Sequence, residues 1–212
     1  MDLINTENPW YNISPGDYES HMSHPAVHQL QLLNTIFREQ YTDYPPKNLV
    51  YLGICTGNGL EHVDPELTDT VWGIDVNEGF LALCADRYGP AMKNLRLQKV
   101  DINHTLFETG DVDLIIANLV LEYIDTDRFF RQIDKIAGAA TVISLVFQDN
   151  KSVPAVSPSG TTALQVLSGF HRDLDLPGLE TAMAAGGFQI IRTKTYSLPA
   201  GKDFVRVDFR RA

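Results

Sequence analysis

The sequence has few cysteines, no long hydrophobic run and no surplus of basic residues, and each shortage excludes a class of protein. Its two cysteines, Cys55 and Cys84, cannot form the multiple disulfides that stabilise small secreted domains. No stretch approaches the roughly 18 consecutive apolar residues of a membrane-spanning helix. The polar, acidic segment Met1–Pro9 lacks the features of a signal peptide. We therefore expect a cytoplasmic protein that does not associate with a membrane.

The charge balance argues against a nucleic-acid partner. The chain has 27 acidic and 17 basic residues, a net charge of −10. Proteins that neutralise phosphates usually carry a basic stripe. The densest basic cluster here, Arg206, Arg210 and Arg211, is interpreted as solvated charge on a strand. With 212 residues, of which 44% are hydrophobic, the chain is expected to form one globular domain whose partner is a small molecule.

Short apolar segments alternate with segments of helical periodicity, which predicts an α/β protein. A helix is predicted to open at His24-Pro25 and to end before Tyr44-Pro45, and the preceding residues 1–22 show no clear period. Such alternation predicts a parallel sheet with right-handed crossovers. Five strands, expected to be buried, are predicted at 49–52, 70–75, 95–100, 112–119 and 140–147, with helices at 78–88, 126–137 and 176–185.

The C-terminal part of the chain has a different pattern. The segments 188–196 and 204–210 alternate apolar and polar residues and are joined by a turn at Leu198–Gly201. They predict an antiparallel hairpin at the end of the sheet. The Ser- and Pro-rich stretch Lys151–Gly160 predicts a loop.

A glycine-rich turn, Gly53–Gly59, follows the first predicted strand and precedes a short helix that ends near Pro65. Glycines let the backbone turn tightly and approach a ligand closely, and the N-terminus of the following helix offers free N–H groups. Because ligands bind at the carboxyl ends of strands in open parallel sheets, this turn is a candidate ligand site.

Acidic residues follow the next two strands. Asp75 ends the second strand, where a carboxylate commonly accepts hydrogen bonds from two ribose hydroxyls. Its alternative role is to cap the helix that starts near Asn77. Asp101 follows the third strand, where it can reach an adenine amino group, or it can cap a short helix instead. The pattern favours a nucleotide-like ligand.

Together these segments resemble the class I S-adenosylmethionine (SAM)-dependent methyltransferases of small-molecule type. The resemblance covers about residues 48–210. LGICTGNG resembles the family's LGxGTGxG motif, GIDV and VDIN resemble its second and third motifs, and IIANLVLEYI resembles a fourth motif that many members write xxLxLEH. The implied fold is a Rossmann-like three-layer α/β/α sandwich with a seven-stranded, mostly parallel sheet and an antiparallel C-terminal hairpin. Residues 1–47 would form a lid segment and helix, and residues 48–212 the SAM-binding domain.

The resemblance also implies the cofactor and the residues that bind it. The cofactor would be SAM, and the product S-adenosylhomocysteine (SAH). The glycine turn would line the methionine and ribose, two acidic residues and their neighbours would hold ribose and adenine, and the end of the fourth strand would lie near the sulfonium. These residues are Gly53, Ile54, Cys55, Thr56, Gly57, Asn58, Gly59, Asp75, Val76, Asp101, Ile102, Asn118 and Leu119.

Two positions depart from the family pattern. Tyr51 replaces a common acidic residue, so a backbone carbonyl near Gly53 or Asn118 would have to hold the methionine ammonium. Cys55 replaces a common glycine, which predicts either an ordinary φ there or backbone strain.

The acceptor site is predicted from fewer signals. Tyr123 falls where related members have histidine, and Tyr123 and His21 are candidate catalytic residues, with core packing and a solvated loop as their alternatives. His171, near Asp173 and Asp175, either forms an acid–base pair or simply precedes the helix at 176–185. No metal site is expected. Candidate acceptor-binding residues are Tyr18, His24, Phe147 and Gln148.

Two other functions compete with methyl transfer. An NAD(P)-dependent oxidoreductase of the short-chain type shares the glycine loop, but it needs a Tyr-x3-Lys motif, and no tyrosine here has lysine four residues on. A non-catalytic SAM-binding module is suggested by Tyr51 and Cys55. Turnover of an acceptor would separate it from an enzyme.

Overall fold

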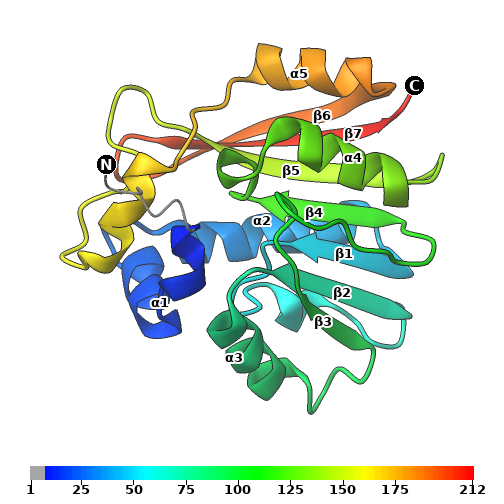
Figure 1. Ribbon diagram of the computed structural model, residues 1–212, viewed down its shortest axis with the longest axis horizontal. Helices are drawn as coiled ribbons and strands as arrows, with labels where there is room; N and C mark the ends of the chain where they lie inside the picture. Colours follow the sequence, from blue (N-terminus) through cyan, green and yellow to red (C-terminus); the bar gives the residue numbers. More distant parts are fainter. Residues whose placement is uncertain (1–7) are drawn as a thin grey trace, which may run out of the picture.

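A seven-stranded mixed sheet forms the centre of the molecule. The computed structural model describes residues 8–212 (Figure 1). The strand order is β3-β2-β1-β4-β5-β7-β6; the first five strands are parallel, and β7 runs antiparallel between β5 and β6. This confirms the predicted α/β fold with its C-terminal hairpin. The strands are β1 Asn48–Leu52, β2 Thr70–Asp75, β3 Leu95–Lys99, β4 Leu114–Asn118, β5 Val142–Asp149, β6 Phe188–Ser197 and β7 Asp203–Arg211.

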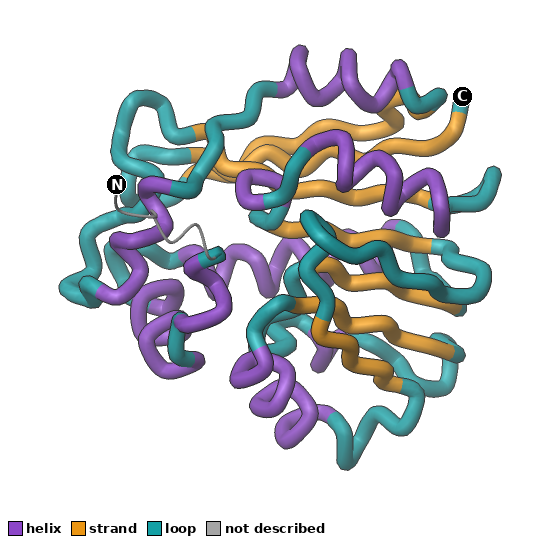
Figure 2. The backbone as a smooth tube through the Cα atoms, in the orientation of Figure 1, coloured by secondary structure: helices purple, strands orange, loops and turns teal. Residues whose placement is uncertain are grey.

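Helices cover both faces of the sheet, which gives three layers (Figure 2). Phe37 of α2 and Cys84 of α3 pack in one apolar cluster with β1 and β4, whereas Phe129 of α4 and Met183 of α5 pack in a second cluster on the other face. The α-helices are α1 Pro15–Ser23, α2 Gln29–Asp43, α3 Glu78–Tyr88, α4 Thr126–Ile136 and α5 Leu176–Ala185; short 3-10 turns are η1 Pro9–Asn12, η2 Leu60–His62, η3 Leu121–Tyr123 and η4 Ala163–Gly169.

The predicted strands are found with small shifts at their ends. β2, α3 and α5 have the predicted bounds, and the short helix after the glycine turn is the single 3-10 turn η2. The expectation of five buried strands is wrong for β3. This strand lies at the edge of the sheet, and Arg96 and Lys99 on it are exposed. An edge strand has a neighbour on one side only, so part of it remains solvated.

The N-terminal helices differ from the prediction. The helix α2 begins at Gln29 rather than at Pro25, because His28 adopts a left-handed backbone with φ of 55° that ends the turn begun at His24. Helix α1 was not predicted, although Ser14 caps it by accepting a hydrogen bond from the N–H of Asp17. Ser14-Pro15 is a readable start signal. Residues 1–7 of the predicted lid lie outside the described residues.

The interpretation of Arg206 as solvated strand charge is wrong. Its side chain is 0% exposed and donates two hydrogen bonds to Asp208, at 2.9 and 2.6 Å, while Nη1 lies 2.9 Å from a carboxylate oxygen of Asp43. The alternation in β7 was misleading because both faces of this strand are covered. Arg211 hydrogen-bonds Asp134, so the basic cluster forms no continuous stripe.

None of the helices between residues 8 and 212 combines the length and the apolar character needed to cross a membrane.

Candidate active site

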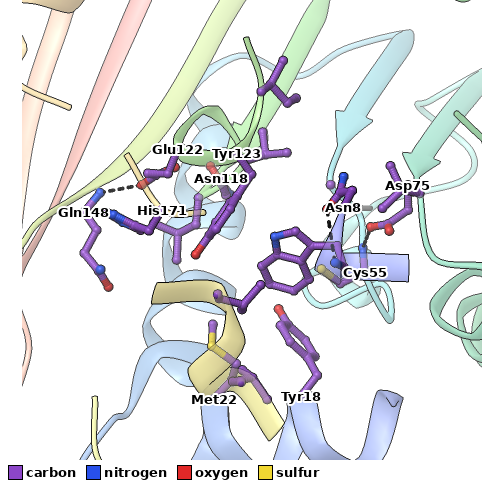
Figure 3. A pocket seen from close by; sticks show the side chains of 18 of the residues that line it. Asn8, Tyr18, Met22, Cys55, Asp75, Asn118, Glu122, Tyr123, Gln148 and His171 are labelled. Atoms are coloured by element: carbon purple, nitrogen blue, oxygen red, sulfur yellow. Dashed lines mark hydrogen bonds between the residues drawn. The ribbon is translucent and has the colours of Figure 1, made fainter. Parts of the chain in front are cut away.

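A cavity of about 1030 Å³, counting the part open to solvent, lies at the carboxyl ends of the parallel strands. The turns after β1, β2, β3 and β4 and the end of β5 form its base, and segments near residues 8–33 and 155–171 cover it. Figure 3 shows Asp75, Cys55 and Asn8 at one end of this cavity and Glu122, Tyr123 and His171 at the other. We call these the cofactor end and the acceptor end.

Asp75 is the central residue of the cofactor end. Its two oxygens accept hydrogen bonds from the backbone N–H groups of Cys55 and Asn77, at 2.8 and 2.9 Å. Burial raises the pKa of this carboxyl to about 6, although these backbone hydrogen bonds oppose the shift. The N–H of Val76 and the thiol of Cys55 also interact with this carboxyl. The helix α3 is capped by Asn77, whose side chain accepts from the N–H of Phe80, so Asp75 is not needed as the cap.

Asp101 links the cofactor end to its cover. One of its oxygens accepts from the N–H of Asn103 at 2.9 Å, and the other accepts from the hydroxyl of Tyr11 at 2.8 Å and from Asn8 at 3.4 Å. The predicted adenine contact is therefore also an anchor of the N-terminal segment. Val76 and Ile102 line the cavity on either side and provide apolar walls.

Several residues of the glycine turn adopt a left-handed backbone conformation, with positive φ. Gly53, Gly57 and Gly59 have φ of 64°, 87° and 99°. A Cβ at Gly59 would lie 2.5 Å from the ring of Phe37, so no larger residue fits there. Cys55 has φ of 48°, which answers the alternative left open above in favour of strain.

Tyr51 supports the glycine turn from below. Its ring packs against Phe37, with 5.1 Å between centroids, and its hydroxyl donates to the carbonyl of Asn58 at 3.3 Å. Part of the supporting role expected of the usual acidic residue is thus performed by a neutral side chain.

Asn118 lies at the end of β4 between the two ends of the cavity. Its amide exchanges two hydrogen bonds with the amide of Gln40, at 2.9 and 3.0 Å, and Gln40 also donates to Ser144. Leu119, the next residue, has φ of 57°. Two of the strained non-glycine residues, Cys55 and Leu119, therefore line this cavity, and such strain is common at functional sites.

The acceptor end is built around Tyr123, Glu122 and His171. The rings of Tyr123 and His171 meet edge to face at 5.7 Å, and the N–H of Arg172 donates to the carbonyl of Glu122 at 3.0 Å. Burial raises the pKa of Glu122 to about 7, raises that of Tyr123 and lowers that of His171. Tyr123 and His171 therefore favour their neutral forms at pH 7, whereas Glu122 is partly ionised there. A tyrosine that holds its proton this firmly is a poor general base, which disfavours the predicted role of Tyr123.

His21 and Gln148 line the cavity, but their polar atoms already have protein partners. Nδ1 of His21 lies 2.7 Å from the hydroxyl of Ser159. The amide of Gln148 accepts from Gln29 at 2.8 Å and donates to Asn150 and to the carbonyl of Ala155. These side chains hold the covering segments together.

The cavity collects most, but not all, of the residues proposed from the sequence. Those that line it are Gly53, Cys55, Asp75, Val76, Asp101, Ile102, Asn118, Leu119, Tyr18, His21, Tyr123 and Gln148. Those that do not are Ile54, Thr56, Gly57, Asn58, Gly59, His24 and Phe147. Phe147 is buried in the core, and Nδ1 of His24 accepts from the N–H of Ala26 in the turn before α2.

Several cavity residues were not proposed as site residues. Trp10 packs edge to face on Tyr18, Phe80 and Tyr123, and Met22, Leu33, Leu164 and Leu167 add apolar wall. His171 was considered as part of an acid–base pair, and Glu122 lies within the IIANLVLEYI motif, but neither was assigned to the site. No local pattern marks these residues, because tertiary contacts between distant segments bring them to the cavity.

Comparison with known proteins agrees with this geometry. Residues 50–139 match the family model described as a methyltransferase domain. Among curated proteins, none matches the sequence significantly.

Solved structures share the fold at low sequence identity. Magnesium protoporphyrin IX methyltransferase from Synechocystis PCC 6803, with bound SAH, is 16% identical over 88% of this chain and 84% of its own, with a TM-score of 0.63. Geranyl diphosphate C-methyltransferase from Streptomyces coelicolor A3(2) is 12% identical over 95% and 85%, with a TM-score of 0.65. The [4+2]-cyclase SpnF is 15% identical over 85% and 80%, with a TM-score of 0.65.

The methyltransferase domain contains the turn, the β2 carboxylate and the β4 end that build the cavity. The strand order and the reversed β7 are those expected of the family. Residues 50–139 thus match a methyltransferase domain, and the chain as a whole shares its fold with solved SAM-dependent methyltransferases.

Proposed function

We propose that the protein transfers the SAM methyl group to a small-molecule acceptor held at the acceptor end of the cavity. The observation that carries the proposal is that one cavity is lined both by Asp75 and Asp101 and by Tyr123 and His171. A cofactor at one end and an acceptor at the other would meet beside Asn118 and Leu119. SAM supplies an activated methyl group, so the protein has mainly to align the reactants and exclude water.

At the cofactor end, we assign Asp75 to the ribose hydroxyls. Its buried carboxyl, held by the N–H groups of Cys55 and Asn77, lines the cavity and suits two neighbouring hydroxyl donors. Val76 and Ile102 would pack on the adenine, and Asp101 would receive its amino group beside the Tyr11 hydroxyl. The methionine ammonium would be held by backbone carbonyls near Gly53 or Asn118.

The chemistry of the acceptor end favours a small and mostly apolar acceptor. Met22, Leu33, Val156, Leu164 and Leu167 form its walls. Among the described residues, no lysine or arginine lines the cavity, which argues against a phosphorylated acceptor and against nucleic acid.

The N-terminal segment is proposed to act as the lid of this site, as part of an N-terminal unit of residues 1–47. Trp10 reaches between Tyr18 and Tyr123, and Asn77 donates to the backbone carbonyls of Trp10 and Ile13, both at 2.8 Å. A cover held at both the cofactor end and the acceptor end would keep bulk water away from the reacting groups. Aromatic faces beside a sulfonium also attract it by cation–π interaction.

We propose a cytoplasmic location, which is supported by two free thiols, Cys55 and Cys84.

Calorimetry with SAM, SAH and NADH tests the cofactor assignment. We expect both SAM and SAH to bind and NADH to give no heat. Binding of NADH alone would overturn the proposal in favour of an oxidoreductase. Incubation of the protein and methyl-labelled SAM with a metabolite extract, followed by mass spectrometry, then tests turnover. Binding of SAM without any labelled product would favour the non-catalytic module.

A further inference from the structure

Three buried polar atoms without a partner gather at the acceptor end. Within residues 8–212, six buried side-chain nitrogen or oxygen atoms have no hydrogen-bond partner, and three of them belong to residues that line this cavity. They are Nε1 of Trp10, Oε2 of Glu122 and Nε2 of His171. Unpaired buried polar atoms destabilise a fold, so several of them around one cavity point to a ligand that pairs them.

The three residues are neighbours. The ring of Tyr123 contacts that of Trp10 at 5.1 Å and that of His171 at 5.7 Å, both edge to face. The backbone of Glu122 is hydrogen-bonded to Arg172, the residue after His171. The three residues therefore line the same part of the cavity, around Tyr123, so a ligand bound there would face this set of unpaired atoms.

The polar groups at the acceptor end include both hydrogen-bond donors and hydrogen-bond acceptors. The indole N–H of Trp10 only donates, and Tyr123 keeps its proton and donates as well. Oε1 of Glu122 accepts from the N–H of Gln148 at 2.9 Å, which leaves Oε2 for another partner.

His171 supplies an acceptor. Its Nδ1 lies 3.7 Å from a carboxylate oxygen of Asp173, too far for a hydrogen bond, but the nearby negative charge favours a proton on Nδ1. In that tautomer Nε2, which has no protein partner, is the acceptor. Burial and the positive charge of Lys202 lower the pKa of His171, Asp173 opposes them, and the neutral ring is favoured at pH 7.

We propose that the acceptor end binds a neutral, apolar molecule through one weakly acidic hydroxyl group, of phenol or enol type, and that Nε2 of His171 takes the hydroxyl proton. This inference rests on the proposed function. A hydroxyl oxygen both accepts from Trp10 or Tyr123 and donates to His171. An ammonium group would leave the donors unpaired, and a carboxylate or phosphate would meet Glu122 without a lining cation.

The transfer step balances with His171 as the base. The O–H bond of the acceptor breaks and its proton goes to Nε2 of His171. The oxygen lone pair forms the bond to the methyl carbon, while the bond from that carbon to sulfur breaks and its electron pair stays on the sulfur of SAH. The imidazolium then returns its proton to solvent. The products are a methyl ether and SAH.

Binding to the SAH-loaded protein tests the inference without turnover. The probes are para-propylphenol, its methyl ether, and the benzylamine and benzoate of the same shape. We expect the phenol to bind at least about tenfold more tightly than each of the other three, as measured by calorimetry. If the phenol does not exceed the other three, the inference is overturned. Failure of the protein to bind SAH would instead contradict the proposed function.

A pair of variants tests the residue. His171→Gln should lower phenol affinity about tenfold or more while SAH affinity stays unchanged. His28→Asn, an exposed histidine whose left-handed backbone asparagine tolerates, should leave both affinities unchanged. Equal phenol affinity in His171→Gln and the unaltered protein would overturn the role of His171. Circular dichroism of both variants checks that the fold is kept.

Discussion

The two ends of the cavity differ in how their polar atoms are satisfied. At the cofactor end, both oxygens of Asp75 accept backbone N–H groups, and Asp101 is bonded to Asn103 and Tyr11. At the acceptor end, Glu122 and His171 each keep one buried atom without a protein partner. A site whose groups are held by the main chain is prearranged for one ligand. A site with buried polar atoms that lack protein partners depends on its ligand to supply their hydrogen bonds.

The largest effect is expected from removing the carboxylate of Asp75, which two backbone N–H groups hold in place. Asp75→Ala should weaken SAM binding by roughly 2–3 kcal/mol, the contribution of hydrogen bonds to a charged group. Calorimetry measures this loss. Asp113→Ala is a matched control, because Asp113 also accepts two backbone N–H groups, from Lys47 and Asn48, but precedes β4, at the amino edge of the sheet. Equal SAM affinity in the two variants would mean that Asp75 only supports the backbone.

This difference also explains what could be predicted from the sequence. Asp75, Asp101 and the glycine turn follow strands, and a strand–turn–helix pattern is local, so the cofactor end could be proposed in advance. Trp10 has no local sequence signal, and the nearby Asp173 marked His171 without showing that it lies in the cavity. Both η1 and the segment after η4 reach the cavity only through tertiary packing. Arg206 shows the same limit, because alternation along β7 cannot reveal that Asp43 and Asp208 enclose it.

A second prediction concerns the pH dependence of folding stability at the acceptor end. The pKa of Glu122 is raised by burial from 4.5 to about 7. The native state therefore binds more protons than the unfolded state between these values, and this group makes stability fall as pH rises from about 4.5 to 7. Glu122→Gln keeps an acceptor for the N–H of Gln148 and removes the charge. Its stability should fall less over this range.

Urea unfolding of both proteins across this pH range measures the effect. Asp75, whose pKa is raised to about 6, and the histidines His21 and His171, whose pKa is lowered, also titrate there. They are present in both proteins, so the difference between the two curves isolates Glu122. Parallel curves would show that its carboxyl titrates normally and that the acceptor end is not desolvated as described.

The smallest expected effect tests strain in the main chain of the cofactor end. Cys55 holds φ of 48° while its N–H donates to Asp75. A side chain in the left-handed region costs about 1–2 kcal/mol, partly offset in glycine by the greater freedom of its unfolded chain. Cys55→Ala removes the thiol but keeps the Cβ, and Cys55→Gly removes both. Because the two variants differ in the Cβ alone, their comparison separates backbone strain from loss of the thiol's contact with Tyr18. Urea unfolding should find the glycine variant more stable than the alanine variant by about 1 kcal/mol. If alanine is as stable as glycine, the turn at Cys55 is relaxed, and the cofactor end is held by its hydrogen bonds without stored strain.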